Sequence, residues 1–535
     1  MSKGPRAFIA LDRGTATTAV ALVGRVHGSW RLLGATAAPS IVDPDAVVER
    51  MLRRFAAGEP ELAEVLRLTD PDAAVDLPRV ACATTRPPEI AVVAATARVL
   101  GPLAAAAASA GWRVRPLVLD GVEILPVATA LADRRVSAIL AGASDPPGAD
   151  ERGLLPDLET LVAAATERRP DLVTVLAGGL ATPGGRIEAL FRPDRPGPTV
   201  LGPSPAAGDG EPLRELLDSL RGGDHDGRRA LATATATLAE VLRRRVEVVE
   251  VGQAGASRAV AAYTAGKPGQ ARWASVPAAA LLPPSFSDAH LDAITGWLTI
   301  PLDRLRVRDR LRELALVPWG DASGEGALLR MAAVRAALGR LVEATPGLSS
   351  KPAADIVVAS GGAWSVAPAP AVALALADVI RRPGVRALGW DHARLLAPLG
   401  TIADAEERRS IMTDLRDDLL VPLGSVVMPA GMRAGRAAGH LSITGPGGSA
   451  ELDLVPGGLE LVDLPPGERA VVEMRFRDPV DLGLRVKHAA VEVAGGLAGL
   501  LVDLRDVPLR LPDRPERRRD LLTAWQAALW AGIDQ

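Results

Sequence analysis

The sequence has few of the residues that build disulfides and metal centres. It contains one cysteine, Cys82, and six histidines that are scattered along the chain. A single cysteine cannot form an internal disulfide, and the histidines show no spacing typical of a metal site. We expect Cys82 to be a small buried strand residue rather than a nucleophile. This cysteine usage fits a cytosolic compartment.

Long apolar runs and an excess of basic charge are also absent. No segment reaches the ~18 uninterrupted apolar residues of a membrane span, and the apolar run before Asp12 is too short for a signal peptide. The formal net charge of −3 gives no basic field that would indicate a nucleic-acid partner. Lysine is scarce and arginine abundant, which we attribute to genome composition. We therefore expect a cytoplasmic protein with no membrane span and no nucleic-acid partner.

The length and apolar content of the chain indicate a globular protein with several domains. With 535 residues, 48% of them apolar and 23% charged, it is long enough for roughly three or four globular domains. From about Val421 onward, short apolar runs alternate with Gly/Pro turns, which predicts a compact all-β domain.

The stretch Phe8–Leu22 reads as a strand, a hydroxyl-rich turn and a second strand. Asp12 ends the first apolar run, and the turn contains the glycine and hydroxyl residues Gly14, Thr15, Thr17 and Thr18. Backbone N–H groups of a glycine turn can surround a phosphate, hydroxyls add donors, and a carboxylate can hold Mg²⁺ through water. The alternative is an ordinary hairpin whose turn is rich in threonine.

The same pattern recurs in the middle of the chain. The strand Val246–Val251 carries Glu250 near its end, and the turn Gly252–Ser257 leads to a returning strand, Ala259–Tyr263. A strand bearing a tryptophan follows each copy. The repetition indicates an internal duplication, and it carries more weight than either copy alone.

Gly178 and Gly179 form a further glycine pair, and this pair also follows a predicted strand. Val136–Gly142 and Leu172–Gly179 flank the helical pattern of Leu154–Arg168, which predicts a β-α-β unit in a partly parallel sheet. Gly178 and Gly179 form a loop at the carboxyl end of a strand, where α/β proteins usually bind ligands, although a plain β-to-α turn is the alternative. Pro116 places the predicted strand around it at a sheet edge.

A strand that ends in Ser360-Gly361-Gly362 completes the pattern. Two duplicated sheets with facing hairpins would clamp the phosphates of a nucleotide, and the Gly-Gly turn would let the adenine lie against backbone. This layout resembles the actin-like ATPase superfamily, in which two phosphate loops and an adenosine loop occur in this order.

A closer resemblance is to the MutL family of glutamate mutase accessory proteins. The chain is similar to this family at six collinear stretches, which are Asp12 with Gly14, Thr15 and Thr18; Ala177-Gly178-Gly179; Glu250 through Ser257; Ser360 through Ala363 with Pro368; Asp391 through Gly400; and Val493 through Leu511.

The resemblance implies an α/β protein with a duplicated actin-like (ribonuclease H-like) ATPase fold and a C-terminal all-β domain. The domains would be a first lobe over 1–245 with an inserted β-α-β segment, a second lobe over 246–420, an all-β domain over 421–512 and a C-terminal helix over 513–535. ATP and Mg²⁺ would be the cofactors, with Asp12 and Glu250 as catalytic and metal-binding residues. The remaining cofactor-binding residues would be Gly14, Thr15, Thr17, Thr18, Gly178, Gly179, Gly252, Gly255, Ser257, Ser360, Gly361 and Gly362.

The departures from the family concern phosphate chemistry. Ala19 stands where the family has lysine, Gly255 and Ala256 replace threonines, and Ser257 replaces the closing aspartate. An active ATPase, a nucleotide binder with little hydrolysis, and a fold retained without nucleotide all remain open.

By resemblance, the first functional hypothesis is an ATP-binding accessory protein that reactivates or assembles a partner enzyme, such as an adenosylcobalamin-dependent mutase. The second is a non-hydrolysing pseudo-ATPase scaffold that binds protein partners. A sugar or acid kinase is less favoured, because no aspartate can be assigned as a base for a hydroxyl substrate.

Overall fold

The computed structural model of the protein describes residues 6–69, 77–84, 87–181, 199–221, 226–267, 269–283, 286–317, 323–349, 352–365, 367–433 and 436–530. The chain divides into two compact units. One comprises residues 1–85, 225–273 and 279–535, and the other comprises residues 86–224 and 274–278. In the described ranges, no helix is both long and apolar enough to cross a membrane.

The first lobe of the larger unit is built on the predicted hairpin at the start of the chain, which is confirmed. Its sheet has the order β3-β2-β1-β4, with β1 antiparallel to β2 and parallel to β4. Alternate residues of β1 enter two cores, Ile9 packing toward α1 and α2 and Phe8 toward α10. These elements are β1 (Ala7–Arg13), β2 (Thr17–Val26), β3 (Ser29–Pro39), β4 (Arg79–Ala83), α1 (Pro44–Gly58), α2 (Pro60–Leu66) and α10 (Gly227–Leu242).

The second lobe repeats this arrangement. In its eight-stranded sheet the segment β12-β11-β10-β13 has the same order as β3-β2-β1-β4, with β10 antiparallel to β11 and parallel to β13. The sheet continues through β14, β15, β21 and β18. Its strands are β10 (Arg245–Val251), β11 (Ala256–Ala262), β12 (Ala271–Val276), β13 (Ile356–Ser360), β14 (Gly384–Trp390), β15 (Val421–Met428), β18 (Leu459–Val462) and β21 (Leu500–Asp503).

One hydrophobic cluster joins the two lobes. It contains Phe8 of β1, Leu231 of α10 and Val248 of β10, together with apolar residues of α15 and α16. On the second lobe, α13 contacts β10, β11 and α14. Further helices of the larger unit are α11 (Asp288–Thr295), α12 (Arg304–Leu316), α13 (Gly324–Ala344), α14 (Ala369–Val379), α15 (Leu396–Gly400), α16 (Ala405–Asp414) and α17 (Pro515–Trp530).

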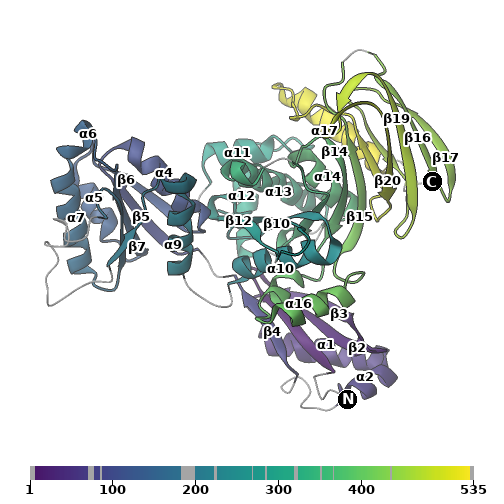
Figure 1. Ribbon diagram of the computed structural model, residues 1–535, viewed down its shortest axis with the longest axis horizontal. Helices are drawn as coiled ribbons and strands as arrows, with labels where there is room; N and C mark the ends of the chain where they lie inside the picture. The colour runs from purple at the N-terminus through teal and green to yellow at the C-terminus, as the bar shows by residue number, and fades with distance from the viewer. Residues whose placement is uncertain are drawn as a thin grey trace. The chain divides into compact units, whose positions relative to one another are not determined.

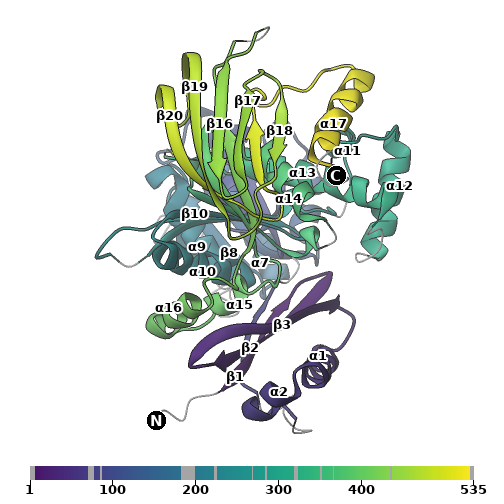
Figure 2. The same ribbon diagram turned by 90° about the vertical axis from the view of Figure 1, so that its right-hand side faces the viewer.

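The C-terminal β region is continuous with the second lobe. The sequence predicts a compact all-β domain from 421, and the first strand of that range, β15, pairs with β14 along its length while β21 pairs with β15. Four further strands form their own sheet in the order β17-β16-β19-β20, and α17 lies beside β18 (Figure 2). These strands are β16 (Gly439–Gly445), β17 (Gly448–Asp453), β19 (Arg469–Asp481) and β20 (Arg485–Ala494).

The smaller unit is a doubly wound α/β domain. Its five strands are all parallel in the order β6-β5-β7-β8-β9, with α4 and α9 on one face and α5 and α7 on the other (Figure 1). The predicted β-α-β unit is confirmed as β7-α7-β8, and the strand with Pro116 lies at the sheet edge. The elements are β5 (Glu89–Ala94), β6 (Arg113–Val118), β7 (Val136–Ala143), β8 (Val173–Gly178), β9 (Thr199–Gly202), α4 (Ala97–Ser109), α5 (Ile124–Leu131), α6 (Ala149–Arg152), α7 (Leu155–Arg168) and α9 (Glu211–Arg221).

Candidate nucleotide site

The β1–β2 and β10–β11 hairpins have the same register. Asp12 lies opposite Ala19 in the first, and Glu250 lies opposite Ser257 in the second. Each turn is closed by the amide of its first glycine, which donates to a carbonyl oxygen. The Gly14 N–H to Thr17 O distance is 3.0 Å, and the Gly252 N–H to Gly255 O distance is 2.9 Å. The structure therefore shows that the repeated sequence pattern is a repeated turn geometry.

Both carboxyl groups stand at the carboxyl ends of central strands. On the parallel side, Asp12 is paired in register with Cys82 of β4, and Glu250 with Ser360 of β13. Cys82 is buried as predicted, and its Sγ lies 3.5 Å from Oδ1 of Asp12. The two acidic residues are thus equivalent positions of the duplicated fold.

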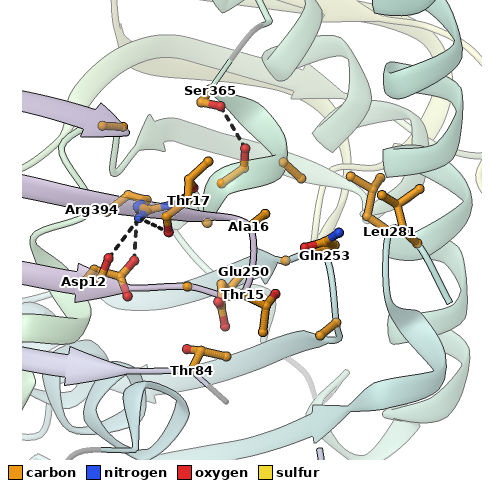
Figure 3. A pocket seen from close by; sticks show the side chains of 18 of the residues that line it. Asp12, Thr15, Ala16, Thr17, Thr84, Glu250, Gln253, Leu281, Ser365 and Arg394 are labelled. Atoms are coloured by element: carbon orange, nitrogen blue, oxygen red, sulfur yellow. Dashed lines mark hydrogen bonds and ion pairs between the residues drawn. The ribbon is translucent and has the colours of Figure 1, made fainter. Parts of the chain in front are cut away.

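A pocket of about 270 Å³ opens between these two turns, just below the ~300–1,000 Å³ range of small-molecule sites (Figure 3). All of its lining residues belong to the larger unit. The predicted site residues that line it are Asp12, Gly14, Thr15, Thr17, Glu250, Gly252, Gly255, Gly361 and Gly362.

The other predicted site residues do not line this pocket. Thr18, Ser257 and Ser360 are buried in their strands, and the Ser360 hydroxyl donates to Oδ2 of Asp391 over 2.9 Å. Gly178 and Gly179 belong to the smaller unit, where Gly178 ends β8 in the left-handed region with φ 60°. Their predicted part in nucleotide binding remains a prediction.

Sequence reasoning missed Arg394, which fills one side of the site. Its Nε lies 3.0 Å from Oδ2 of Asp12, Nη1 donates to the Thr17 hydroxyl over 2.7 Å, and Nη2 donates to the carbonyl oxygens of Asp12 and Thr17 over 3.0 and 3.1 Å. Figure 3 shows this side chain reaching the first hairpin. The Arg394 side chain is 8% exposed. Asp12 therefore has a protein cation as its partner.

Asp391 shapes the turn that presents Arg394. Its carboxylate accepts from the amides of Leu395 and Leu396 over 2.8 and 3.4 Å, and Arg394 takes a left-handed backbone with φ 54°. Burial raises the pKa of Asp391 to about 6, against the opposing hydrogen bond from Ser360. The resemblance pointed to this stretch through Asp391, but it gave no role to the arginine inside it.

The charge of Glu250 depends on its surroundings. Desolvation raises the pKa of its carboxyl group to about 7, the Asp12 carboxylate adds to the rise, and Arg228 and the Ser257 hydroxyl oppose it. Arg330 of α13 lines the same pocket. Among the described residues, the charged side chains that line the pocket are thus two arginines, one aspartate and a glutamate that is part-protonated near neutral pH. This set favours an anionic ligand.

A divalent metal ion does not fit the site as it is arranged. Oδ2 of Asp12 is paired with Arg394, and Oδ1 lies against the Cys82 thiol. In the part of the chain that the structure describes, no group of three or more His, Cys, Asp or Glu side chains could hold a metal ion. On the Asp12 side of the acid pair that the sequence offers as Mg²⁺ ligands, both carboxylate oxygens thus already have a protein partner.

The repeated β-β-β meander with a parallel fourth strand, present in both lobes and facing one pocket, defines a duplicated actin-like (ribonuclease H-like) ATPase fold with an added β region. The fold class predicted from the sequence is confirmed.

No protein-family model matches the chain, and no curated protein matches it. Solved structures with similarity to this chain have low sequence identity to it. Component A of (R)-2-hydroxyglutaryl-CoA dehydratase from Acidaminococcus fermentans is 7% identical, with a TM-score of 0.27 over 75% of this chain and 98% of that one. An acetone carboxylase in its nucleotide-free state is 11% identical, with a TM-score of 0.27 over 83% and 80%. A PilM–PilN type IV pilus biogenesis complex is 12% identical, with a TM-score of 0.23 over 77% and 98%. Similarities at this level do not assign a function or the MutL family.

Proposed function

We propose that this chain is an ATP-binding accessory protein that acts on a partner protein through nucleotide-dependent movement of its two actin-like lobes. The observation that carries the proposal is the pair of hairpin turns, identical in register, that face one pocket together with the Gly361-Gly362 turn. The two turns belong to different lobes, and they line one cavity together with Arg330 and Arg394.

In this proposal the two turns hold the phosphates. The Gly14 and Gly252 amides close their own turns, so the amides that follow, at Thr15 and Gln253, are the ones expected to donate to phosphate oxygens. Arg330 supplies positive charge from α13. The adenine would lie at the Gly361-Gly362 turn, which lines the same pocket.

Hydrolysis is expected to be slow or absent. The second turn carries Gly255 and Ala256 where hydroxyls would orient water, and no lysine stands at position 19. Glu250 is the remaining acid at the second turn, and it is part-protonated near neutral pH. Binding without turnover is therefore the form of the function that these residues support best.

The client is proposed from the resemblance to the MutL family alone. It would be an enzyme complex such as an adenosylcobalamin-dependent mutase, which the accessory protein reactivates or assembles in the manner of a chaperone. Lobe closure on nucleotide would change the surface presented to that client. Co-purification of the native protein followed by mass spectrometry tests this part separately.

Isothermal titration of the full chain with ATP tests the proposal. We expect saturable binding to the wild type and its loss in Gly252→Val, because a Cβ atom added at Gly252 would lie 3.2 Å from the carbonyl oxygen of Gly255. Gly447→Val is the matched control, because nothing lies within 4 Å of its Cβ position. No binding to the wild type at millimolar ATP would overturn the proposal.

A non-hydrolysing scaffold is the second candidate, and the Asp12–Arg394 ion pair favours it, because this pair ties the hairpin of the first lobe to the second lobe through protein side chains alone. Asp12→Ala separates the two functions when partner capture is measured. A scaffold keeps its partner in this variant, whereas a nucleotide-driven protein loses the ATP-dependent part of the interaction.

A further inference from the structure

We propose that Arg394 is the resident cation of the first turn, and that this site takes the phosphates of a nucleotide without a divalent metal ion at Asp12. The inference rests on the proposed nucleotide binding and adds the charge chemistry of the ligand. It concerns a residue that lies outside every glycine turn of the sequence pattern.

At the first hairpin, a hard cation would use oxygen atoms of Asp12 and Thr17. These are Oδ2 and the carbonyl oxygen of Asp12, with the carbonyl and hydroxyl oxygens of Thr17, and all four contact the Arg394 guanidinium at 2.7–3.1 Å. Mg²⁺ requires oxygen ligands in near-octahedral geometry at shorter distances. The Arg394 guanidinium therefore contacts the four oxygen atoms that would otherwise be available as metal ligands.

The Arg394 side chain is enclosed by neighbouring groups on two sides. A Cβ atom on Gly362 would lie 3.0 Å from Nη1 of Arg394, which shows how closely the second-lobe glycine turn covers the guanidinium. On the other side, the Asp391 carboxylate fixes the chain that carries it through the amides of Leu395 and Leu396. Displacing Arg394 would leave the mostly buried Asp12 carboxylate without its cation.

Arg394 also supplies the positive charge that is missing at position 19 of the first hairpin. Ala19 stands opposite Asp12, where the resembling family carries lysine, so the first hairpin has no cation of its own at that position. Arg394 brings the missing positive charge to the same carboxylate from the segment between β14 and α15. With Arg330 in the pocket wall, two arginines face the anion. Phosphate charge is then offset without a metal ion.

Titration of the full chain with ATP in EDTA and again in excess MgCl₂ tests the inference. We expect dissociation constants that agree within about fivefold, a difference of about 1 kcal/mol. Binding that is more than fivefold tighter with Mg²⁺ overturns the inference and leaves the proposed nucleotide function standing. Absence of binding under both conditions overturns the proposed function instead.

Mn²⁺ titration followed by electron paramagnetic resonance tests the occupied ligand set without nucleotide. The wild type is expected to leave Mn²⁺ free, and Arg394→Gln is expected to bind it because the Asp12 carboxylate is released. Arg304→Gln, which removes an exposed arginine paired with Asp292, is the control and should behave as the wild type. Stoichiometric Mn²⁺ binding by the wild type overturns the inference, and a folded Arg394→Gln that binds none shows that Asp12 is not a metal ligand even when freed, which overturns it as well.

Discussion

Arg394 and Asp12, 382 residues apart in the chain, form an ion pair with 3.0 Å between Nε and Oδ2. The pair joins the turn after β14 of the second lobe to the hairpin of the first. Because both side chains are mostly buried, neither is well solvated by water when its partner is removed. The Asp12–Arg394 ion pair therefore affects both the stability of the contact between the two lobes and the charge of the pocket.

Arg394→Gln is expected to lower the free energy of unfolding by about 3 kcal/mol, because it leaves the Asp12 carboxylate without a cation. A double-mutant cycle with Asp12→Asn, measured by urea unfolding, should give a coupling energy of about 1–3 kcal/mol. The exposed Arg304–Asp292 pair is the matched control, with about 0–1 kcal/mol expected for Arg304→Gln. Additive losses in the Asp12–Arg394 cycle would show that the pair contributes nothing beyond its single residues.

Glu250 should make stability fall as pH rises. Its pKa is raised from 4.5 to about 7 in the folded protein, so between these values the folded state binds more protons than the unfolded state. The destabilising effect begins near pH 4.5 and is complete above pH 7. Glu250→Gln removes this contribution. The melting temperature of the variant minus that of the wild type should therefore increase as pH rises from about 5 to about 8. A difference that stays constant across this range would contradict the assigned cause.

Gly361 is expected to tolerate no side chain. Its φ is +96°, and a Cβ atom would lie 2.6 Å from the carbonyl oxygen of Val251, which is backbone and cannot move aside alone. Gly361→Ala should destabilise the protein by about 2 kcal/mol or more in urea unfolding. Gly58→Ala, at the end of α1 where nothing lies within 4 Å, should be neutral or stabilising by up to about 1 kcal/mol. Equal effects of the two substitutions would argue against a tight turn at Gly361.

Asp378 of α14 should be among the most sensitive acidic residues of the second lobe. Its carboxylate accepts from Nε of Arg335 over 2.6 Å and from Nη1 of Arg505 over 2.7 Å, and all three side chains are buried. Asp378→Asn removes the negative charge that both arginines share and should lower the free energy of unfolding by about 3–5 kcal/mol. Glu49→Gln, from the exposed Glu49–Arg53 pair, should change it by less than about 0.5 kcal/mol.

The same network explains the carboxyl-terminal stretch that resembles the MutL family. Asp503 is fully buried and accepts from Arg505 and from Arg381, and the Arg505 guanidinium lies 4.5 Å from the ring centroid of Trp525 in α17. This stretch holds the end of β21 and the last helix against the second lobe. None of its described residues lines the pocket between the two hairpin turns.

The local elements of the site could be predicted from the sequence. Alternating apolar residues and a glycine turn fix the β1–β2 and β10–β11 hairpins, because strand period and turn chemistry involve only neighbours in the chain. The boundary at 421 is different. The predicted all-β domain begins with β15, which pairs with β14 of the second lobe, and the apolar pattern does not say which partner a strand takes.

The sequence by itself determined the duplication, the acidic residue at each turn and the absence of a lysine at position 19, since each is a matter of residue type and spacing. Only the tertiary structure decided what Asp12 meets. An arginine 382 residues away reaches it because the chain crosses from β14 to the first lobe at Asp391, and no local pattern encodes a contact over that separation. The protein cation that Asp12 meets therefore follows from a contact between the two lobes.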